Sequence, residues 1–258
     1  MFDIRQFERI TYRNITNEIL DFVVENILRM DNIIGILICE GDINSIDYAV
    51  YSAVFPDLYV IPVGGCSTVT RLTRRLMEKL SIFDFYVFGI IDRDALSKRE
   101  IKLLYRNASV YTTKLPFIEN IICAPETLIQ VANYKNIDPD VLISKVQDEL
   151  IKILWQKLKE ALPINLGISK NEKIGFLSIG ASTRRQQISK EVCQSNVLYS
   201  YRDKVITNIV ASHIGLKTRK DYYNLIKSML VDDTYRPLLV KVFTNFIPKL
   251  ELYNLNDY

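Results

Sequence analysis

The sequence has few of the residues that build disulfide frameworks and zinc sites. Its 258 residues include four cysteines and one histidine, His213. The cysteines are far apart and form no CxxC pair, so neither a disulfide framework nor a zinc site is predicted. Reduced cytoplasmic thiols are the simpler expectation, and a single histidine in an apolar segment is typical of a structural role.

Long apolar runs are also lacking. The longest are too short to span a bilayer, and the first ten residues, MFDIRQFERI, lack the basic and apolar blocks of a signal peptide. The sequence contains no GxxxxGK[ST] motif, so an ATPase activity would have to come from another polypeptide. We therefore expect a soluble, cytoplasmic protein that makes no contact with a membrane.

What the chain does have is enough apolar content for a substantial core. Hydrophobic residues make up 48% of the sequence, which is compatible with one large domain or two small ones. The net charge is +3, with residues 1–130 at −3 and residues 131–258 at +6. A basic half of this size is compatible with phosphate binding, although solvated helical surfaces are often equally basic.

Apolar strands alternate with amphipathic helices up to about residue 130. Continuous apolar strands alternating with helices predict an α/β fold with a parallel four-stranded sheet covered on both faces, in the Rossmann-like class. A helix over residues 14–30 precedes the sheet. The expected strands are 33–39, 58–63, 85–91 and 108–112, and the expected helices between them are 45–54, 68–80 and 97–105.

The second half is predicted to be mostly helical. We place a domain boundary near residue 130, with a catalytic domain over 1–130 and a helical domain over 131–258 for dimerisation, partner or nucleic-acid contacts. A short strand is expected at 174–178, and loops at 163–173 and 180–185. The expected helices are 141–162, 189–199, 203–214, 221–231 and 237–246.

Carboxylates follow two of the predicted strands. IIGILICEGD places Glu40 after the first strand, and FYVFGIIDRD places Asp92 and Asp94 after the third. If these strands are neighbours, their acids meet at the carboxyl edge of the sheet, where such folds bind ligands. In extended backbone Asp92 and Asp94 point the same way, so both can converge with Glu40.

Clustered carboxylates require compensation. Two of them about 4 Å apart repel by roughly 4 kcal/mol at an effective dielectric near 20. A divalent cation offsets this repulsion directly, and the alternative is that one carboxyl stays protonated. Taken singly, Asp42 or Asp94 could simply cap the following helix. The two motifs together, in their strand context, favour a Mg²⁺ or Mn²⁺ site.

Four short motifs in order resemble a known catalytic fold. They are EGD at 40–42, PVGG at 62–65, IDRD at 91–94 and FIEN at 117–120. This combination resembles the Toprim domain of topoisomerases, bacterial primases and OLD-type nucleases over residues 33–130. Within that family it is most similar to the AriB-type nuclease subunits of PARIS anti-phage defence systems, in which a short Toprim domain is joined to a helical half.

The resemblance implies roles for individual residues. Glu40 would be a metal ligand or general acid/base, Asp92 and Asp94 would be metal ligands, and Glu119 would serve a second metal. It also implies a homodimer held inactive by an ATPase partner. The sequence departs from the family after Glu40, where the acid that many relatives carry three or four residues later is missing, and Lys114 matches the family's basic group poorly.

Several residues are candidates for phosphate contacts. Gly64 and Gly65 lie between a strand and a helix, where backbone amides can approach a phosphate, and a tight turn explains them equally well. Arg71 on the next helix could flank the acids, and Lys114 is the other basic candidate. Exposed helix charges and a solvated loop lysine are the simpler interpretations of these two. Tyrosines such as Tyr199 and Tyr223 are expected to pack rather than to act as nucleophiles.

The sequence therefore predicts a divalent-metal-dependent nuclease that cleaves DNA or RNA, acting as the toxic effector of an anti-phage system. The first alternative is a primase-like nucleotidyl transferase, against which the lack of a zinc-binding module counts. The second is a non-enzymatic, receiver-like regulatory domain whose acids form a phosphoacceptor pocket. Receivers are shorter and require a well-placed lysine after a late strand.

Overall fold

A computed structural model describes residues 20, 21, 23–25, 33–81, 85–94, 96–161, 197–199 and 204–250 of the chain. The chain divides into two compact units. The first, called the sheet unit below, contains residues 1–118 and 225–258, and the second, called the helical unit, contains residues 119–224. The sequence predicts a single boundary near residue 130, whereas the chain passes between the two units twice.

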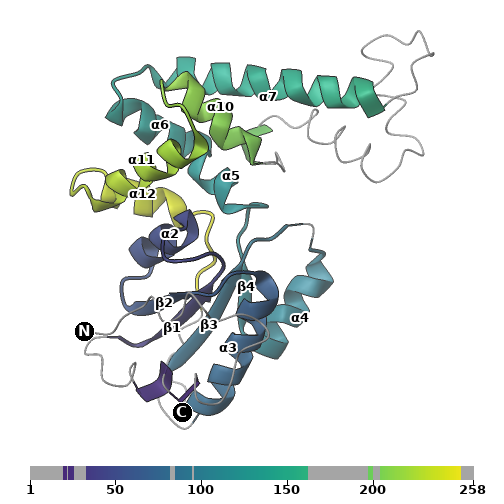
Figure 1. Cartoon of the computed structure of the whole chain (residues 1–258), viewed down its shortest axis with the longest axis vertical. Coiled ribbons are helices and arrows are strands. Elements are labelled where there is room, and N and C mark those ends of the chain that lie inside the picture. Colours follow the sequence, from purple (N-terminus) through teal and green to yellow (C-terminus); the bar gives the residue numbers. More distant parts are fainter. Residues whose placement is uncertain are drawn as a thin grey trace. The chain divides into compact units, whose positions relative to one another are not determined.

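The sheet unit is built on a four-stranded parallel sheet with the strand order β2-β1-β3-β4 (Figure 1). Its register places Cys39 of β1 opposite Pro62 of β2 and Ile90 of β3. The predicted α/β, Rossmann-like fold class and the adjacency of the first and third strands are confirmed. The strands are β1 (Gly35–Cys39), β2 (Leu58–Pro62), β3 (Tyr86–Ile91) and β4 (Val110–Thr112).

The central strand explains why the apolar runs are uninterrupted. All five residues of β1 are buried, because helices cover both faces of a parallel sheet of this kind. Helix α2 (Ile46–Val54) packs against β2, whereas α3 (Cys66–Leu80) packs against β1, β3 and α4 (Lys98–Ala108). Figure 1 shows α2 on the opposite side of the sheet from α3 and α4.

Helix α3 has one apolar side, which forms the larger core. Its buried side chains recur at helical spacing and pack with residues of β1 and β3. Two residues of the N-terminal helical segment, Leu20 and Val23, belong to the same core. The α3 residues in this core are Val69, Leu72, Leu76 and Leu80.

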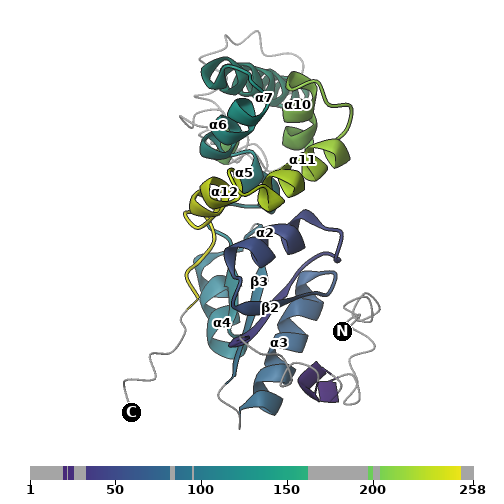
Figure 2. The ribbon, with the colours of Figure 1, turned by 90° about the vertical axis from the view of Figure 1, so that its left-hand side faces the viewer.

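The helical unit combines several short helices with one long helix, α7, which Figure 1 shows lengthwise and Figure 2 nearly end-on. Helix α7 packs against α6 and α10, and the fully buried Tyr222 donates its hydroxyl to the Ile122 carbonyl oxygen at 2.6 Å. None of the described helices is long and apolar enough to cross a bilayer. The elements are α5 (Ile118–Ile122), α6 (Pro125–Tyr134), α7 (Pro139–Ala161), η2 (Val197–Tyr199), α10 (Val205–His213) and the first part of α11 (Arg219–Val231).

The C-terminal segment returns to the sheet unit. Helix α12 (Arg236–Phe243) packs against α2, and the backbone N–H of Lys114 donates to the Phe246 carbonyl oxygen at 2.8 Å. This return is the reason that residues 225–258 belong to the sheet unit rather than to the helical one.

Most predicted elements of the first half are present within a few residues of their expected bounds. Helices α5 and α6 were not predicted; Pro125 occupies the start of α6, where its missing N–H costs nothing. Helix α4 continues to Ala108 and ends at Ser109, whose φ is 47°, so β4 starts two residues later than expected. The predicted strand 174–178, the loops 163–173 and 180–185, and most of the helices 14–30 and 189–199 lie outside the described residues.

Candidate active site

Glu40 and Asp92 meet at the carboxyl edge of the sheet. Glu40 directly follows β1, and Asp92 directly follows β3, its neighbour. The Glu40 Oε2 atom accepts a hydrogen bond from the Asp92 backbone N–H at 3.1 Å. Both residues are half-buried. The two strand-end acids are therefore joined by a direct contact at the place where ligands bind in folds of this class.

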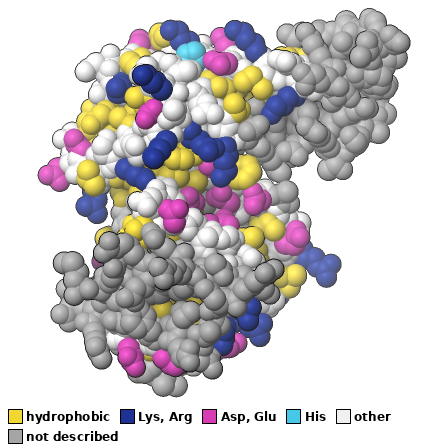
Figure 3. All heavy atoms as spheres, viewed as in Figure 1, with side chains coloured by type: hydrophobic (Ala, Val, Ile, Leu, Met, Phe, Trp, Pro, Cys, Tyr) yellow, Lys and Arg dark blue, Asp and Glu magenta, His cyan; other side chains and the backbone are white. Residues whose placement is uncertain are grey.

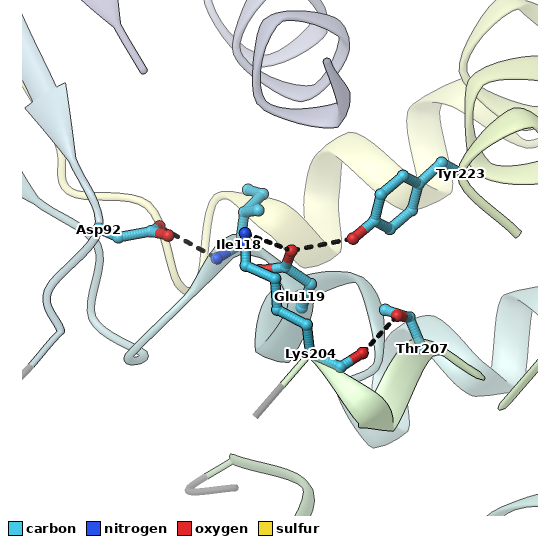
Figure 4. A network of polar contacts seen from close by, with 6 residues as sticks. All are labelled: Asp92, Ile118, Glu119, Lys204, Thr207 and Tyr223. Atoms are coloured by element: carbon cyan, nitrogen blue, oxygen red, sulfur yellow. Dashed lines mark hydrogen bonds and ion pairs between the residues drawn. The ribbon is translucent and has the colours of Figure 1, made fainter. Parts of the chain in front are cut away.

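A second hydrogen bond orients Asp92. Its Oδ1 atom accepts from the Ile118 backbone N–H at 3.1 Å, as the dashed line on the left of Figure 4 marks. Ile118 is the first residue of α5, so one of the unpaired N–H groups of that helix end is satisfied by the carboxylate. These two bonds hold the Asp92 carboxylate and the Glu40 carboxylate in defined positions.

Asp94 does not continue the extended geometry that the sequence analysis assumed. Strand β3 ends at Ile91, and Asp94 has a φ of 44°, in the left-handed region. Its backbone N–H donates to the Pro116 carbonyl oxygen at 3.0 Å, and the residue is exposed. The rule that residues i and i+2 point the same way holds only in extended backbone. The extended geometry on which this convergence was predicted is therefore absent at Asp94, and its convergence with Glu40 and Asp92 stays a prediction.

The loop after Glu40 is held by a glycine pair. Gly41 and Gly64 form an antiparallel bridge with N–H to oxygen distances of 2.7 and 2.8 Å. Gly41 has a φ of 87°, and a Cβ atom there would lie 2.5 Å from the Ser45 Oγ atom. Asp42 accepts from the Asn44 N–H at 2.7 Å, so it forms the turn, and Ser45 caps α2.

Sequence reasoning missed a further acid beside the site. Asp47 lies in the first turn of α2, and a Cβ atom on Gly41 would be 3.8 Å from its Oδ2 atom. The signal was available: Ser45 is a favourable cap, which places Asp47 in the first helical turn near the end of β1.

Two buried groups beneath the site respond to these acids. Tyr51 is almost fully buried, and burial followed by the charges of Asp92 and Asp47 raises the pKa of its phenol well above the ordinary value. Burial, with Asp47 and Glu40, likewise raises the pKa of the Cys39 thiol. Negative charge is therefore concentrated at this edge, and the Cys39 thiol stays protonated and unreactive.

Glu119 lies in the helical unit and is almost fully buried. Its Oε1 atom accepts from the Tyr223 hydroxyl at 2.9 Å and lies 3.4 Å from the Lys204 Nζ atom. Figure 4 shows Tyr223 and Lys204 approaching the carboxylate. Lys204 directly precedes α10, and its backbone carbonyl oxygen accepts a hydrogen bond from the Thr207 hydroxyl. Burial and Glu119 raise the pKa of Tyr223. The Glu119 Oε2 atom is buried without a hydrogen-bond partner among the described residues.

The four residues predicted to contact phosphate differ in the hydrogen bonds that they already make within the protein. The Gly64 N–H is already bonded to Gly41, whereas Gly65 precedes α3 and has open space around a Cβ position. Arg71 is exposed on α3. The Lys114 Nζ atom donates to the Asn245 carbonyl oxygen at 2.8 Å, so in this structure Lys114 fastens the C-terminal segment. Of the two glycines, Gly65 is thus the better placed.

Basic side chains outside the acidic edge are spread over both units. Figure 3 shows several Lys and Arg side chains gathered in one patch on the face that it draws. The single histidine, His213, pairs with Glu149 at 2.7 Å rather than with an acid of the sheet unit. Within the sheet unit, Lys227 of α11 donates to the Asn44 carbonyl oxygen in the loop that follows Glu40.

The oxygen atoms at this edge include ligands that a divalent cation can use. Mg²⁺ commonly binds to one or two protein carboxylates, and water and substrate phosphate oxygens complete its coordination. Glu40 and Asp92 supply two carboxylates of this kind. Over the described ranges, no group of three or more His, Cys, Asp or Glu residues is arranged to hold a metal ion. The residues thus fit an ion that shares its ligands with water and substrate, not a closed protein cage.

Comparisons of the chain with protein-family models, with curated proteins and with solved structures found no match.

Proposed function

We propose that the protein is a divalent-metal-dependent nuclease that hydrolyses phosphodiester bonds of nucleic acid at the carboxyl edge of its sheet. The observation that carries the proposal is the contact between Glu40 and Asp92 across neighbouring parallel strands. Two acids fixed side by side, with Asp47 nearby, form a site of concentrated negative charge that a phosphate can approach only with a cation.

Glu40 and Asp92 would hold a Mg²⁺ or Mn²⁺ ion, with Asp94 as the third carboxylate that the sequence predicts. Such an ion, when bound, neutralises phosphate charge and lowers the pKa of water. Asp92 is kept in place by the Ile118 N–H, so its carboxylate is oriented before substrate arrives. Glu40 is half-buried and can take the proton of an attacking water on its carboxylate.

The phosphate side of the site would come from backbone and from α3. Gly65 carries no side chain and precedes the first turn of α3, where N–H groups point outward. Arg71 is one turn further along the same helix and could contact a neighbouring phosphate. The Gly64 N–H is occupied by the Gly41 carbonyl oxygen, so Gly64 would shape the turn and leave the contact to Gly65.

The wider biological role follows from the resemblance of the four motifs to Toprim nucleases of the OLD-like branch. We carry over from it an effector role in anti-phage defence, a homodimer, and control by a separate ATPase subunit. The absence of a GxxxxGK[ST] motif from the sequence supports a separate origin for any ATPase activity. The engagement of Lys114 with Asn245 counts against a receiver-like role, which requires a lysine at the acids.

The test is a cleavage assay on the full chain. Purified protein is incubated with Mg²⁺ or Mn²⁺ and separate pools of plasmid, single-stranded DNA and transfer RNA. We expect shortened products that disappear with EDTA. Asp92→Asn should abolish cleavage while keeping the Oδ1 acceptor for Ile118, and Asp57→Asn, an exposed acid before β2, should cleave normally. Products longer than the substrate in the presence of nucleotides would instead indicate a primase-like transferase.

Metal binding is tested apart from activity. A crystal soaked in Mn²⁺ should give an anomalous peak between the carboxylates of Glu40 and Asp92. The Asp92→Asn protein should lose that peak while its sheet remains intact. A wild-type crystal with no peak at this edge would contradict the metal-dependent mechanism, whatever the cleavage assay reported.

A further inference from the structure

The helical unit carries exposed cations directly before α10 and at the start of α11. Lys217, Arg219 and Lys220 are exposed, and they lie so close in sequence that their Cα atoms are within about 11 Å of each other. Lys204 directly precedes α10, and its side chain is 60% exposed. These residues, Lys204, Lys217, Arg219 and Lys220, are called the basic cluster below.

A network of contacts joins Lys204 to the start of α11. The Lys204 Nζ atom lies 3.4 Å from the Glu119 Oε1 atom, which also accepts from the Tyr223 hydroxyl at 2.9 Å (Figure 4). The guanidinium carbon of Arg219 lies 5.9 Å from the centroid of the Tyr223 ring, which is a cation–π distance. Glu119 and Tyr223 thus hold Lys204 and Arg219 near each other, so the basic cluster is one surface feature.

The acids beside the basic cluster leave most of its charge unpaired. Glu119 is 3% exposed, and its ion pair is made with Lys204. The Asp221 Oδ2 atom accepts from the Thr218 backbone N–H at 2.9 Å and from the Thr218 hydroxyl at 2.8 Å, so this acid caps the helix. Over the described residues, no carboxylate pairs with the other three cations of the cluster. The cluster therefore presents positive charge to solvent.

The surface around the basic cluster favours one kind of polyanion. Between residues 204 and 224, all of which the structure describes, no large hydrophobic side chain is exposed. A helix that lies on a lipid surface buries an apolar face beside its cations, and protein interfaces are built around apolar and aromatic anchors. The phosphate backbone of nucleic acid requires neither, because lysine and arginine contact its phosphates directly.

We propose that the basic cluster binds the phosphate backbone of nucleic acid, so that the helical unit holds the substrate. The Tyr223 ring orients Arg219, whose planar fork of N–H donors suits phosphate oxygens. The lysines add charge without reading base edges, so binding is independent of sequence. The inference rests on the proposed nuclease only for its purpose, because backbone binding is measurable without cleavage.

The test measures binding by the full chain and its dependence on salt. Protein is titrated into a fluorescent single-stranded DNA of about 15 nucleotides in EDTA, and the Kd is read from anisotropy at several salt concentrations. The charge-loss variant combines Arg219→Gln with Lys220→Gln. Its slope of log K against log salt should be shallower by about 1.4, which corresponds to a roughly 25-fold higher Kd at about 0.1 M salt.

Two controls separate the position of the charge from its amount and from folding. Arg219→Lys combined with Lys220→Arg keeps both charges and should keep the slope of the wild type. Lys145→Gln combined with Lys152→Gln removes two exposed cations of α7 in the same unit and should leave both the slope and the Kd unchanged. Equal slopes for this α7 variant and the charge-loss variant would overturn the proposal.

The same variants distinguish nucleic acid from a lipid surface and this inference from the proposed nuclease. If the charge-loss variant bound DNA normally but no longer bound phosphatidylserine vesicles that the wild type binds, the proposal would be overturned in favour of a lipid surface. Normal DNA binding and normal cleavage by this variant would overturn the inference and leave the nuclease standing. The expected change of slope, in a protein without metal-dependent cleavage, would instead contradict the nuclease and support this inference.

Discussion

The Oε2 atom of Glu40 lies 3.1 Å from the backbone nitrogen of Asp92 and accepts its hydrogen bond, although 52 residues separate the two in sequence. The contact exists because β1 and β3 are neighbours and end at the same level, with Cys39 opposite Ile90. It joins a side chain to the backbone of the other acid, so the contact does not itself require either carboxylate to be protonated.

The Glu40 contact predicts that stability and activity respond differently to two substitutions. Glu40→Ala leaves the Asp92 N–H without its acceptor and should lower the free energy of unfolding by about 1–2 kcal/mol. Glu40→Gln keeps an acceptor oxygen and should unfold close to the wild type. Both should lose cleavage by at least about 10²-fold, because neither carries a charged proton acceptor. Urea unfolding and a cleavage assay measure the two effects.

Asp57→Asn serves as the control for these variants, because Asp57 is an exposed acid of the same unit. It should match the wild type in both assays. If Glu40→Gln cleaved at the normal rate, the role of Glu40 as ligand or base would be excluded even though its structural contact would stand.

The adjacency of Glu40 and Asp92 could be predicted from the sequence because it depends only on strand order. Two fully apolar runs followed by acids, in an alternating strand–helix pattern, leave few arrangements other than neighbouring parallel strands. Periodicity also identified the strands themselves. The order of neighbouring strands then follows from right-handed crossover connections.

The backbone conformation at Asp94 could not be predicted from the periodicity of the sequence. Strand β3 ends one residue before Asp92, and the backbone then turns so that Asp94 has a positive φ. The turn is fixed by a bond from the Asp94 N–H to Pro116, a residue beyond β4. The partner of Lys114 could not be predicted from the sequence either, because its acceptor, the Asn245 carbonyl oxygen, lies 131 residues away in the C-terminal segment.

The glycine bridge beside the acids predicts a graded loss of stability. Gly41 and Gly64 have nearly equal φ values of 87° and 85°, so alanine at either pays about 1 kcal/mol for the left-handed backbone. At Gly41 the new Cβ would also lie 2.5 Å from the Ser45 Oγ atom, whereas at Gly64 nothing lies within 4 Å. Gly41→Ala should therefore destabilise the protein by about 2–3 kcal/mol in total.

Gly64→Ala is the matched control, since it reproduces the backbone cost without the clash. Thermal or urea unfolding of the two variants gives the difference directly. Equal losses would mean that the Ser45 side chain moves aside at no cost, and that the loop after Glu40 is looser than its contacts indicate.

The buried tyrosines predict a loss of stability at alkaline pH. Burial and the neighbouring charges of Asp92 and Asp47 raise the pKa of Tyr51 well above the ordinary phenol value of 10.0 in the folded protein. Below pH 10 the phenol is protonated in both states and its contribution is intact. Above pH 10 the unfolded chain releases the proton and the folded chain keeps it, so stability falls as pH rises. Each such phenol should cost about 1.4 kcal/mol at one pH unit above 10.

Tyr51→Phe isolates this contribution, because it retains the ring and removes the titrating hydroxyl. Its free energy of unfolding should decline less steeply than that of the wild type between about pH 10 and pH 11, as measured by urea unfolding at each pH. Parallel declines for Tyr51→Phe and the wild type would show that Tyr51 ionises while folded.

Lys114 distinguishes a structural lysine from a phosphate contact. Its Nζ atom donates to the Asn245 carbonyl oxygen, so Lys114→Met should loosen the C-terminal segment and lower the free energy of unfolding by about 0.5–1.5 kcal/mol. Hydrogen exchange of residues 245–247 should quicken in this variant, while the salt dependence of nucleic-acid binding should not change. The control Lys249→Met alters an exposed lysine of the same segment and should affect neither quantity. A salt slope reduced by about 0.7 with unchanged exchange would instead assign Lys114 to a single-strand phosphate, as the sequence first suggested.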